Sequence, residues 1–204
     1  MLLLLLGGYL LGSVPFGLLI GKRYGIDIRE VGSGNIGATN VWRACGPRAG
    51  VAAMALDILK GLLPALLALR LLPDQPWAHI GTGAMAVLGH SFSPWLGFRG
   101  GKGVATSLGV VVALVPVAAA VGFVVFITLV ATTRYVSVGS MLGALALGLA
   151  VQLSPAPWPY KVLVWLGVLL IIVRHRGNIQ RLLRGEENRF NLKGRAAVEE
   201  TGER

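Results

Sequence analysis

Charged residues are scarce in this chain of 204 residues: Asp, Glu, Lys and Arg make up 14% of it, while hydrophobic residues make up 54%. The mean hydropathy is +0.70. So little charge cannot cover the surface of a soluble domain of this size, and the apolar residues occur in runs long enough to cross a bilayer. The composition therefore excludes an ordinary soluble protein and predicts an integral membrane protein.

Acidic residues are the scarcer charge: 9 Asp and Glu stand against 19 Lys and Arg, which gives a net charge of +10. A basic excess can indicate a nucleic-acid partner. Here the basic residues lie between apolar runs, so they are predicted to form membrane loops, and nucleic acid is excluded as a partner. The start, MLLLLLGGYLLGSVPFG, lacks the charged region and cleavage site of a signal peptide, so it is expected to remain as the first span.

Cysteine and histidine are almost absent. The single cysteine, Cys45, excludes an internal disulfide, and no Cys or His cluster has zinc spacing, so neither a metal nor a cofactor is expected. The H-x-x-x-x-D pair of many acyl-thioester-dependent acyltransferases is missing, because Ala84, Trp95 and Gln180 stand five residues after the three histidines. The G-x-S-x-G elbow of a serine nucleophile is also missing.

The apolar runs predict membrane spans near 2–20, 49–72, 77–96, 104–131, 137–153 and 161–173. Basic residues cluster at 22–48, at 99–102, at Arg134 and from Arg174 onward, and the positive-inside rule assigns these regions to the cytoplasm. The connections 73–76 and 154–160 are short and carry only Asp74 as a charge. They are therefore expected outside.

The stretch 104–131 must enter the membrane and return, because both of its flanks are assigned to the cytoplasm. Pro116 lies near its middle, where it would break a helix, so two short helices are expected, about 104–115 and 117–131. The predicted fold is an all-α integral membrane protein with seven transmembrane helices, its N-terminus outside and its C-terminus cytoplasmic. Whether the two short helices are spans or a re-entrant pair stays open. Residues 1–190 are expected to form one membrane domain, and 191–204 a polar, disordered tail.

The first loop contains the segment GSGNIGATN at 32–40, followed by Arg43. Its first six residues match G-x-G-x-x-G, but a dinucleotide site needs a preceding strand and a βαβ unit, whereas this loop lies between membrane helices. Small residues still allow backbone N–H groups to approach an anion, and Ser33, Asn35, Thr39 and Asn40 add polar groups. A flexible turn is the alternative interpretation.

The second segment, GHSFSPWLGFRGGKGVATS at 89–107, places a GGKG loop before a predicted helix. It is not a Walker A loop, because Leu96 and Gly103 stand where that motif requires Gly and Ser or Thr. A Gly-rich loop, a lysine and a helix N-terminus together suit a phosphate group. Alternatively, Lys102 anchors the loop at the membrane surface.

The third segment comprises RYVSVGS at 134–140 and RHRGNIQRLLRGEEN at 174–188. His175 and Asn178 lie one turn apart after the last span, so they are expected to face one cytoplasmic cavity. The tail arginines can bind anionic membrane lipids, and this is the favoured interpretation for Arg181 and Arg184.

Charges within the spans are few. Asp57 and Lys60 are three residues apart, so they can form an ion pair on one helix face, and pairing and a role in the site are equally supported. His90 is expected to make a hydrogen bond that fixes the helix end before the GGKG loop, with a role as a base as the alternative. His79 has no evident role.

Taken together and in this order, GSGNIGATNVWR, GHSF…FRGGKGVATS and SVGS…HRGNIQRLLRGEEN resemble the bacterial acyl-phosphate:glycerol-3-phosphate acyltransferases over about residues 5–190. The resemblance implies seven membrane helices and a cytoplasm-facing site in the bacterial inner membrane. It also implies transfer of an acyl group from a long-chain acyl phosphate to the 1-hydroxyl of glycerol 3-phosphate, with acyl-CoA and acyl carrier protein not used directly. Phe92-Ser93-Pro94 and Glu186 depart from the family's pattern, which casts doubt on local loop shape only.

By position, the resemblance places the site on residues of all three segments. The expected catalytic residues are Ser33, Arg43, Lys102, His175 and Asn178. The expected substrate-binding residues are Gly32, Gly34, Asn35, Asn40, Gly100, Gly101, Gly103, Ser140 and Glu187.

Two functions from other classes compete with this interpretation. A small transporter or flippase of a phosphate-bearing substrate would place its site in the broken helix 104–131, but transporters usually show internal repeats and sites near the midplane. A scaffold that recruits soluble enzymes through its basic tail would leave the loop motifs unexplained.

Overall fold

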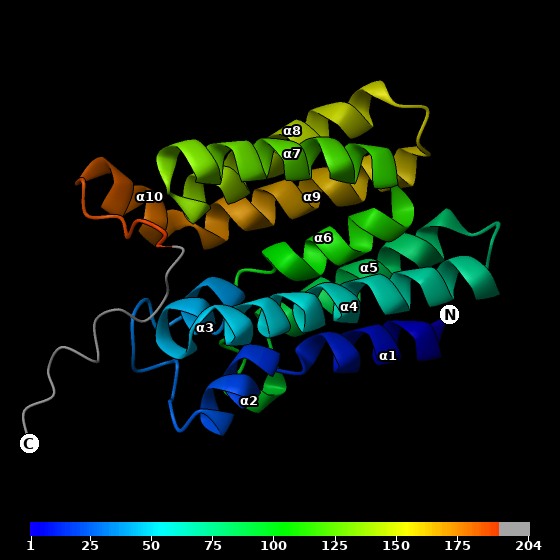
Figure 1. Ribbon diagram of the computed structural model, residues 1–204. Coiled ribbons are helices and arrows are strands. Elements are labelled where there is room, and N and C mark those ends of the chain that lie inside the picture. The colour runs from blue at the N-terminus through cyan, green and yellow to red at the C-terminus, as the bar shows by residue number, and fades with distance from the viewer. Residues whose placement is uncertain (192–204) are drawn as a thin grey trace, which may run out of the picture.

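The computed structural model describes residues 1–191, and within this range the chain forms helices and connecting loops without strands (Figure 1). In chain order the helices are α1 (Leu2–Ser13), α2 (Phe16–Arg23), α3 (Ala38–Cys45), α4 (Pro47–Leu71), α5 (Pro76–Ser91), the 3₁₀ turn η1 (Pro94–Leu96), α6 (Val104–Leu114), α7 (Pro116–Thr133), α8 (Val136–Leu153), α9 (Trp158–Arg174) and α10 (Arg176–Leu183). The tail expected from residue 191 lies, apart from Asn191, outside the described residues.

Four helical stretches of the described chain are each long and apolar enough to cross a bilayer: Leu2–Arg23, Pro47–Leu71, Pro116–Thr133 and Val136–Leu153. Helices α9 and α10 form a fifth candidate with a bend of 53°, and α6 is a shorter apolar helix. The predicted all-helical membrane fold is therefore confirmed in its class.

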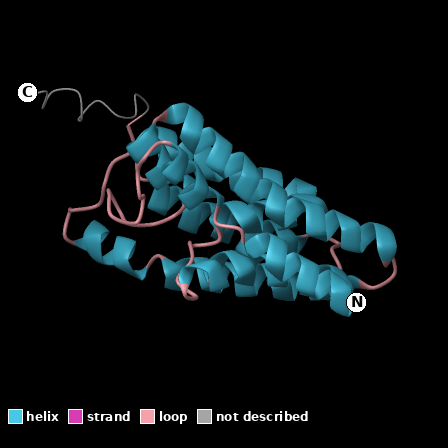
Figure 2. Ribbon diagram, turned by 90° about the horizontal axis from the view of Figure 1, so that it is seen from below, coloured by secondary structure: helices cyan, strands magenta, loops and turns pink. Residues whose placement is uncertain are grey.

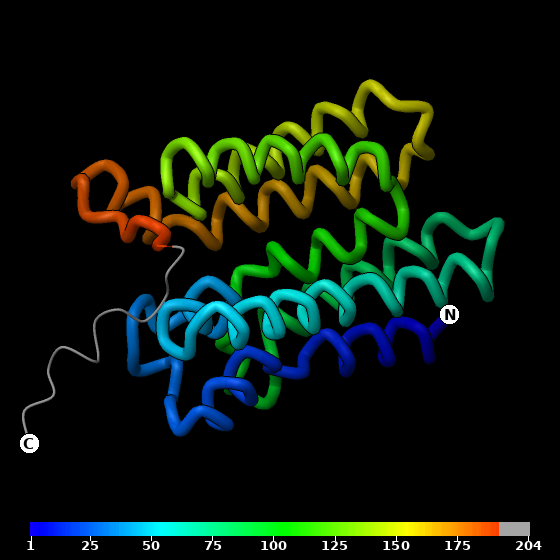
Figure 3. The backbone as a smooth tube through the Cα atoms, in the orientation of Figure 1, coloured from blue at the N-terminus to red at the C-terminus, as the bar shows by residue number. Residues whose placement is uncertain are grey.

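Two proline-associated breaks shape the bundle. Val115 interrupts the run 104–133 just before Pro116, and the chain reverses there, so that α7 runs back beside α6 (Figure 3). The predicted break into two helices is confirmed, and α6 is short as expected, whereas α7 with 18 residues is long enough to cross a bilayer and is not short. The first span is broken as well, because Val14 is extended and α2 begins after Pro15. A residue before proline is driven out of the helical conformation, so Pro15 explains this break.

Glycines bring the helices close together. Helix α1 packs on α5 and α4 packs on α6. A Cβ atom on Gly12 of α1 would collide with the backbone of Ala86, and one on Gly109 of α6 would collide with the carbonyl of Ile58. Small residues at such contacts are typical of membrane bundles, where backbones approach closely enough to gain packing energy.

The bundle has polar loops at one end and short connections at the other. Figure 1 shows α3, α10, the start of α6 and the turn between α7 and α8 toward the end opposite the N-terminus. In Figure 2, long loops gather at that same end. We call this the motif end, because residues 32–40, 99–103, 134–140 and 174–188 all lie there. The α4–α5, α6–α7 and α8–α9 connections lie at the other end.

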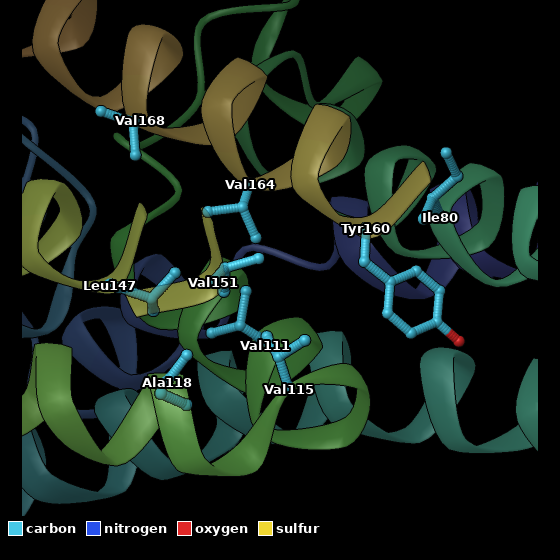
Figure 4. Close-up of a cluster of buried hydrophobic side chains, with 10 residues drawn as sticks. Ile80, Val111, Val115, Ala118, Leu147, Val151, Tyr160, Val164 and Val168 are labelled. Carbon is cyan, nitrogen blue, oxygen red and sulfur yellow. The ribbon is translucent and has the colours of Figure 1, made fainter. Parts of the chain in front are cut away.

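Two apolar clusters pack beneath the loops of the motif end: one lies among α5 to α9, and the other lies between the first loop and α2, α3 and α4. One core cluster joins α5, α6, α7, α8 and α9, and Figure 4 shows Val111, Leu147, Val151 and Val164 of this cluster pointing toward one another. A second cluster joins the first loop to α2, α3 and α4 through fully buried Ile28 and Val41. The loop between α2 and α3 is therefore packed against the bundle.

Candidate active site

A cavity of about 480 Å³ opens among α4 to α9 at the motif end. Its polar lining, or polar wall, includes residues of the three sequence motifs and their neighbours: Ser33, Asn35, Thr39, Asn40, Arg43, Asp57, His90, Lys102, Ser107, Ser137, Ser140, His175, Asn178, Arg181, Glu187 and Asn188. Its apolar wall lies farther along the helices and includes Met54, Ile58, Leu108, Val111, Phe126 and Leu147. The structure thus brings together ten of the fourteen expected site residues, while Gly32, Gly34, Gly100 and Gly101 do not line the cavity.

A chain of hydrogen bonds crosses the polar wall. Lys102 Nζ donates to Asn178 Oδ1 at 2.5 Å, and Asn178 Nδ2 donates to Glu187 Oε1 at 2.6 Å. Ser137 Oγ donates to the same glutamate oxygen at 2.8 Å, and Arg181 Nε donates to Oε2 at 2.9 Å. Glu187 therefore orients the amide that in turn orients Lys102. Ser137 was not among the expected site residues.

The favoured lipid-binding interpretation of Arg181 is wrong in its main point. Its guanidinium pairs with Glu187 and lines the cavity instead of pointing only toward head groups. The pair forms because the chain reverses after α10 at Gly185, whose φ is +71°, and brings Glu187 back beside Arg181. The side chain of Arg184, in contrast, is exposed.

Arg43 enters the cavity from α3. Its Nη2 donates to the carbonyl of Asn188 at 3.3 Å, and the adjacent Trp42 packs against Phe190 with ring centroids 5.2 Å apart. Phe190 N donates to the carbonyl of Arg134 at 2.6 Å. The segment after α10 therefore links the first motif to the turn between α7 and α8.

The first motif is an ordered turn and not a flexible loop. Asn40 Oδ1 accepts the N–H of Ser33 at 3.0 Å, and its Nδ2 donates to the carbonyls of Ile28 and Val31 at 2.8 and 3.1 Å. Asn40 is thus committed to building the loop, although it was expected to bind substrate. The hydroxyl of Ser33 makes no hydrogen bond to another described residue and faces the cavity.

The GGKG loop is fixed from behind. Gly100 N donates to the carbonyl of Ser91 at 3.0 Å, and Gly101 N donates to the carbonyl of His90 at 3.1 Å. Gly103, with φ of +80°, forms the N-terminal boundary of α6 and lines the cavity beside Lys102. The two preceding glycines therefore support the loop, whereas Lys102 and Gly103 face the site.

The segment before this loop is anchored at the break between α1 and α2. Ser93 Oγ donates to the carbonyl of Ser13 at 2.7 Å, and Trp95 Nε1 donates to the Ser13 hydroxyl at 2.9 Å. Sequence reasoning missed this contact, although Pro15 indicated the break that exposes the Ser13 carbonyl.

His175 follows α9 and is buried. Its Nδ1 lies 2.8 Å from the carbonyl of Ile171, and because a carbonyl only accepts, Nδ1 carries the proton and Nε2 keeps a lone pair. Burial, reinforced by the charge of Lys102, lowers the pKa of His175 to about 4. The imidazole is thus neutral near pH 7 and can accept a proton at Nε2.

Electrostatics at the motif end make Lys102 sensitive to pH. Burial, opposed by Glu187 and reinforced by neighbouring arginines, lowers the pKa of Lys102 to about 8. Burial also acts on Glu187, but the hydrogen bonds from Asn178, Ser137 and Arg181 outweigh it and lower the pKa of that carboxyl. Two opposite charges therefore lie at the polar wall near neutral pH.

A buried ion pair on α4 adjoins the cavity, which Asp57 lines. Lys60 Nζ is 2.7 Å from Asp57 Oδ1, which confirms the predicted pairing, and it donates to the carbonyl of Val14 at 2.9 Å. His90 Nδ1 lies 3.7 Å from the same carboxylate oxygen and has no hydrogen-bond partner among the described residues. The hydrogen bond expected of His90 is therefore wrong, since its ring packs instead between Asp57 and Gly101.

The fold and the site by themselves define a class of protein. The chain is a multi-pass membrane protein with a cavity whose one end is basic and hydrogen-bonding and whose other end is apolar. Such a cavity suits an anion attached to a hydrocarbon chain.

The family follows from comparison with known proteins. The model of the glycerol-3-phosphate acyltransferase family matches residues 2–185. Glycerol-3-phosphate acyltransferases of Trichlorobacter lovleyi and Myxococcus xanthus are each 48% identical, over 90% and 92% of this chain and 94% and 98% of those proteins. The chain belongs to this family and is an acyltransferase, not a transporter or a scaffold.

Solved structures agree with this assignment. The chain is similar to the crystal structure of PlsY, an integral membrane glycerol 3-phosphate acyltransferase, in its glycerol 3-phosphate form, with a TM-score of 0.90 and 45% identity over 93% of this chain and 95% of that one. The lysophosphatidic acid form of PlsY gives a TM-score of 0.88 at 43% identity, over 94% and 95% of the two chains.

Proposed function

We propose that this chain transfers a fatty acyl group from acyl phosphate to the 1-hydroxyl of sn-glycerol 3-phosphate. The products are 1-acylglycerol 3-phosphate and inorganic phosphate, and the reaction is the first acylation of phospholipid synthesis. The observation that carries the proposal is that one cavity has both a basic wall, with Arg43 and Lys102, and an apolar lining from the helices. Both substrates are phosphates, and one of them carries a hydrocarbon chain.

In the proposed mechanism, the cavity brings the two substrates together at its motif end. The 1-hydroxyl oxygen bonds to the acyl carbonyl carbon, the bond from that carbon to the phosphate oxygen breaks, and phosphate leaves with the electron pair. Arg43 and Lys102 hold the phosphates, and Ser33, Ser140 and Asn178 orient them. The rate enhancement comes from proximity and from charge stabilisation on the carbonyl and phosphate oxygens.

The hydroxyl proton goes either to His175 Nε2 or to a phosphate oxygen of a substrate. The lone pair on His175 Nε2 allows the first route, but a pKa of about 4 makes this imidazole a weak base near pH 7. The mixed anhydride has a good leaving group, and this supports the second, which needs no protein base.

Transfer is proposed to be direct, without an acyl-enzyme. Ser140, one of the serines that line the cavity, donates its hydroxyl to the carbonyl of Val136 at 2.8 Å, and no basic side chain is among its hydrogen-bond partners in the described part of the chain. Intact-mass measurement after rapid mixing with palmitoyl phosphate tests this point. An added acyl mass that glycerol 3-phosphate then removes would exclude direct transfer.

For the membrane topology, we propose one domain over residues 1–190 with seven membrane helices in the bacterial inner membrane, the N-terminus outside and the motif end cytoplasmic. The concentration of basic residues at the motif end supports this orientation. In a Cys45→Ala background, single cysteines at Asp74 and Arg184 test it. An impermeant maleimide should label position 74 in intact spheroplasts and position 184 only after permeabilisation, and the reverse pattern would invert the orientation.

The activity is tested with purified protein in detergent or lipid, supplied with palmitoyl phosphate and glycerol 3-phosphate. Lysophosphatidate and phosphate should form in equal amounts, and Lys102→Ala should abolish both. Arg184→Gln removes an exposed charge outside the cavity and serves as the matched control. A folded protein that forms neither product would contradict the proposal.

A further inference from the structure

Arg174, the last residue of α9, binds the back of the GGKG loop. Its Nη2 donates to the carbonyl oxygens of Gly100 and Gly101, each at 2.8 Å, and to that of Ser91 at 3.2 Å. The guanidinium carbon lies 5.5 Å from the centroid of the Phe92 ring. Binding of lipid head groups was one interpretation of the tail arginines, but Arg174 is engaged with protein carbonyls.

These contacts fix the direction of one peptide unit. The carbonyl of Gly101 and the N–H of Lys102 belong to the same peptide, and the described chain has no cis peptide bond. In a planar trans peptide the C=O and N–H point in opposite directions. Because the Gly101 carbonyl points to Arg174, the Lys102 N–H points away from it.

The amide of Lys102 is the first free donor of the loop. The N–H groups of Gly100 and Gly101 donate to the carbonyls of Ser91 and His90. The N–H of Lys102 has no acceptor among the described residues. A Cβ atom on Gly101 would collide with the His90 imidazole, so the loop cannot shift toward α5.

The main cavity adjoins Lys102 and Gly103 and is not lined by Arg174. Arg174 lines a hollow of about 410 Å³ that adjoins the main cavity and shares Lys102 and Asn178 with it. Arg174 therefore has two possible relations to an anion: a direct contact through that hollow, or an indirect one through the loop.

We propose that Arg174 is a positioning residue which turns the Gly101–Lys102 peptide so that the Lys102 N–H donates to a phosphate oxygen in the cavity. The ammonium and the amide of Lys102 then bind one phosphate from two directions. The inference rests on the proposed function for its ligand, a terminal phosphate group, which belongs either to glycerol 3-phosphate, a phosphate monoester, or to the acyl phosphate, a mixed anhydride.

Selective labelling can observe this amide directly. The chain contains five lysines, so [15N]lysine gives five backbone amide signals, and the signal absent from Lys102→Arg belongs to Lys102. Protein in lipid nanodiscs is titrated with glycerol 3-phosphate alone and, in a second arm, with dodecyl phosphate, which cannot transfer an acyl group. The arm that moves the Lys102 amide proton downfield identifies which substrate phosphate it binds.

The test variant is Arg174→Lys, which keeps the positive charge but cannot bridge the three carbonyls, and Arg184→Gln is the matched control. In Arg174→Lys the downfield shift should be lost while the other lysine signals stay in place. We expect kcat/KM to fall roughly a hundredfold, the size of effect seen when one backbone-type donor is removed from an active site. The fall should appear in KM for the substrate whose phosphate moved the amide.

Two results would overturn the proposal. A Lys102 amide that shifts in Arg174→Lys as it does in the unaltered protein would make Arg174 a direct ligand or a purely structural residue. In the unaltered protein, the Lys102 amide proton shift should change at a saturating concentration of one of the two phosphates. If neither phosphate changes it, the donor role is refuted, and this result does not depend on whether the variants fold. Lysophosphatidate formation by the same unaltered sample, measured in parallel, separates either result from a failure of the proposed function.

Discussion

Raising the pH through 8 should progressively weaken phosphate binding by the Lys102 side chain. Burial lowers the pKa of this side chain to about 8, so it is cationic below that pH and neutral above it. Since kcat/KM reports the titration of the free enzyme, it should fall as pH rises through this value. The cationic fraction drops roughly tenfold between pH 7 and pH 9, so kcat/KM for glycerol 3-phosphate should drop by about the same factor.

The assay is initial-rate lysophosphatidate formation at fixed ionic strength, with Lys102→Arg as the control. A guanidinium stays charged throughout this range, so the normalised profile of Lys102→Arg should remain flat to pH 9, although its absolute rate is lower because the geometry differs. The substrate phosphate titrates near pH 6, below the window, and does not contribute. Equal slopes for the two proteins between pH 7 and pH 9 would refute the reasoning.

Three further substitutions probe other parts of the structure. Asp57→Asn leaves the Lys60 ammonium buried without its partner, so it should destabilise the protein by about 3 kcal/mol in detergent unfolding, and the double variant with Lys60→Met should recover most of that loss; equal stability of the two variants would contradict this. Glu187→Gln removes the carboxylate that Arg181 and Asn178 share, so kcat/KM should fall about tenfold, matching the roughly 1.5 kcal/mol of one charge-assisted hydrogen bond; full activity would exclude Glu187 from orienting the site. Leu147→Trp fills the apolar end of the cavity, so the kcat/KM ratio of palmitoyl to octanoyl phosphate should fall, whereas an unchanged ratio would place the chain elsewhere.

The sequence predicted the parts of the fold that depend on local chemistry. Pro116 correctly divided the run 104–131, because a proline that starts a helix has a fixed φ and lacks only an N–H group that would be unpaired there anyway. The first span was wrongly expected to be continuous, although Pro15 carried the same signal. Helix α3 begins at Ala38 inside a segment interpreted as loop, since so short a helix is stabilised by packing of Val41 against the bundle and not by local propensity.

The site was predictable as a set of segments but not as a network. Polar groups in four connections on one side of the membrane had to meet, and they do. The partners of Arg174 and Arg181 could not be inferred, because one arginine binds loop carbonyls more than 70 residues away in sequence and the other depends on the reversal at Gly185. Hydrophobic periodicity predicts which face of a helix is buried, and charge predicts on which side of the membrane a loop lies. Neither predicts these contacts, which depend on the tertiary arrangement of the loops.

The most direct test of the account is to locate the acyl chain in the cavity. Leu147 lies ten residues beyond Ser137 on α8, about 15 Å deeper along the helix axis, and belongs to the apolar cluster at that depth (Figure 4). A long-chain acyl phosphate with a diazirine at its terminal carbon should, on illumination, label the segments around Val111, Leu147 and Val164, as detected by mass spectrometry. Glycerol 3-phosphate added before illumination should abolish this labelling, because the acyl group is then transferred and leaves as product. Labelling confined to outward-facing residues such as Leu149 or Leu169, unaffected by glycerol 3-phosphate, would show that the cavity does not hold the acyl donor.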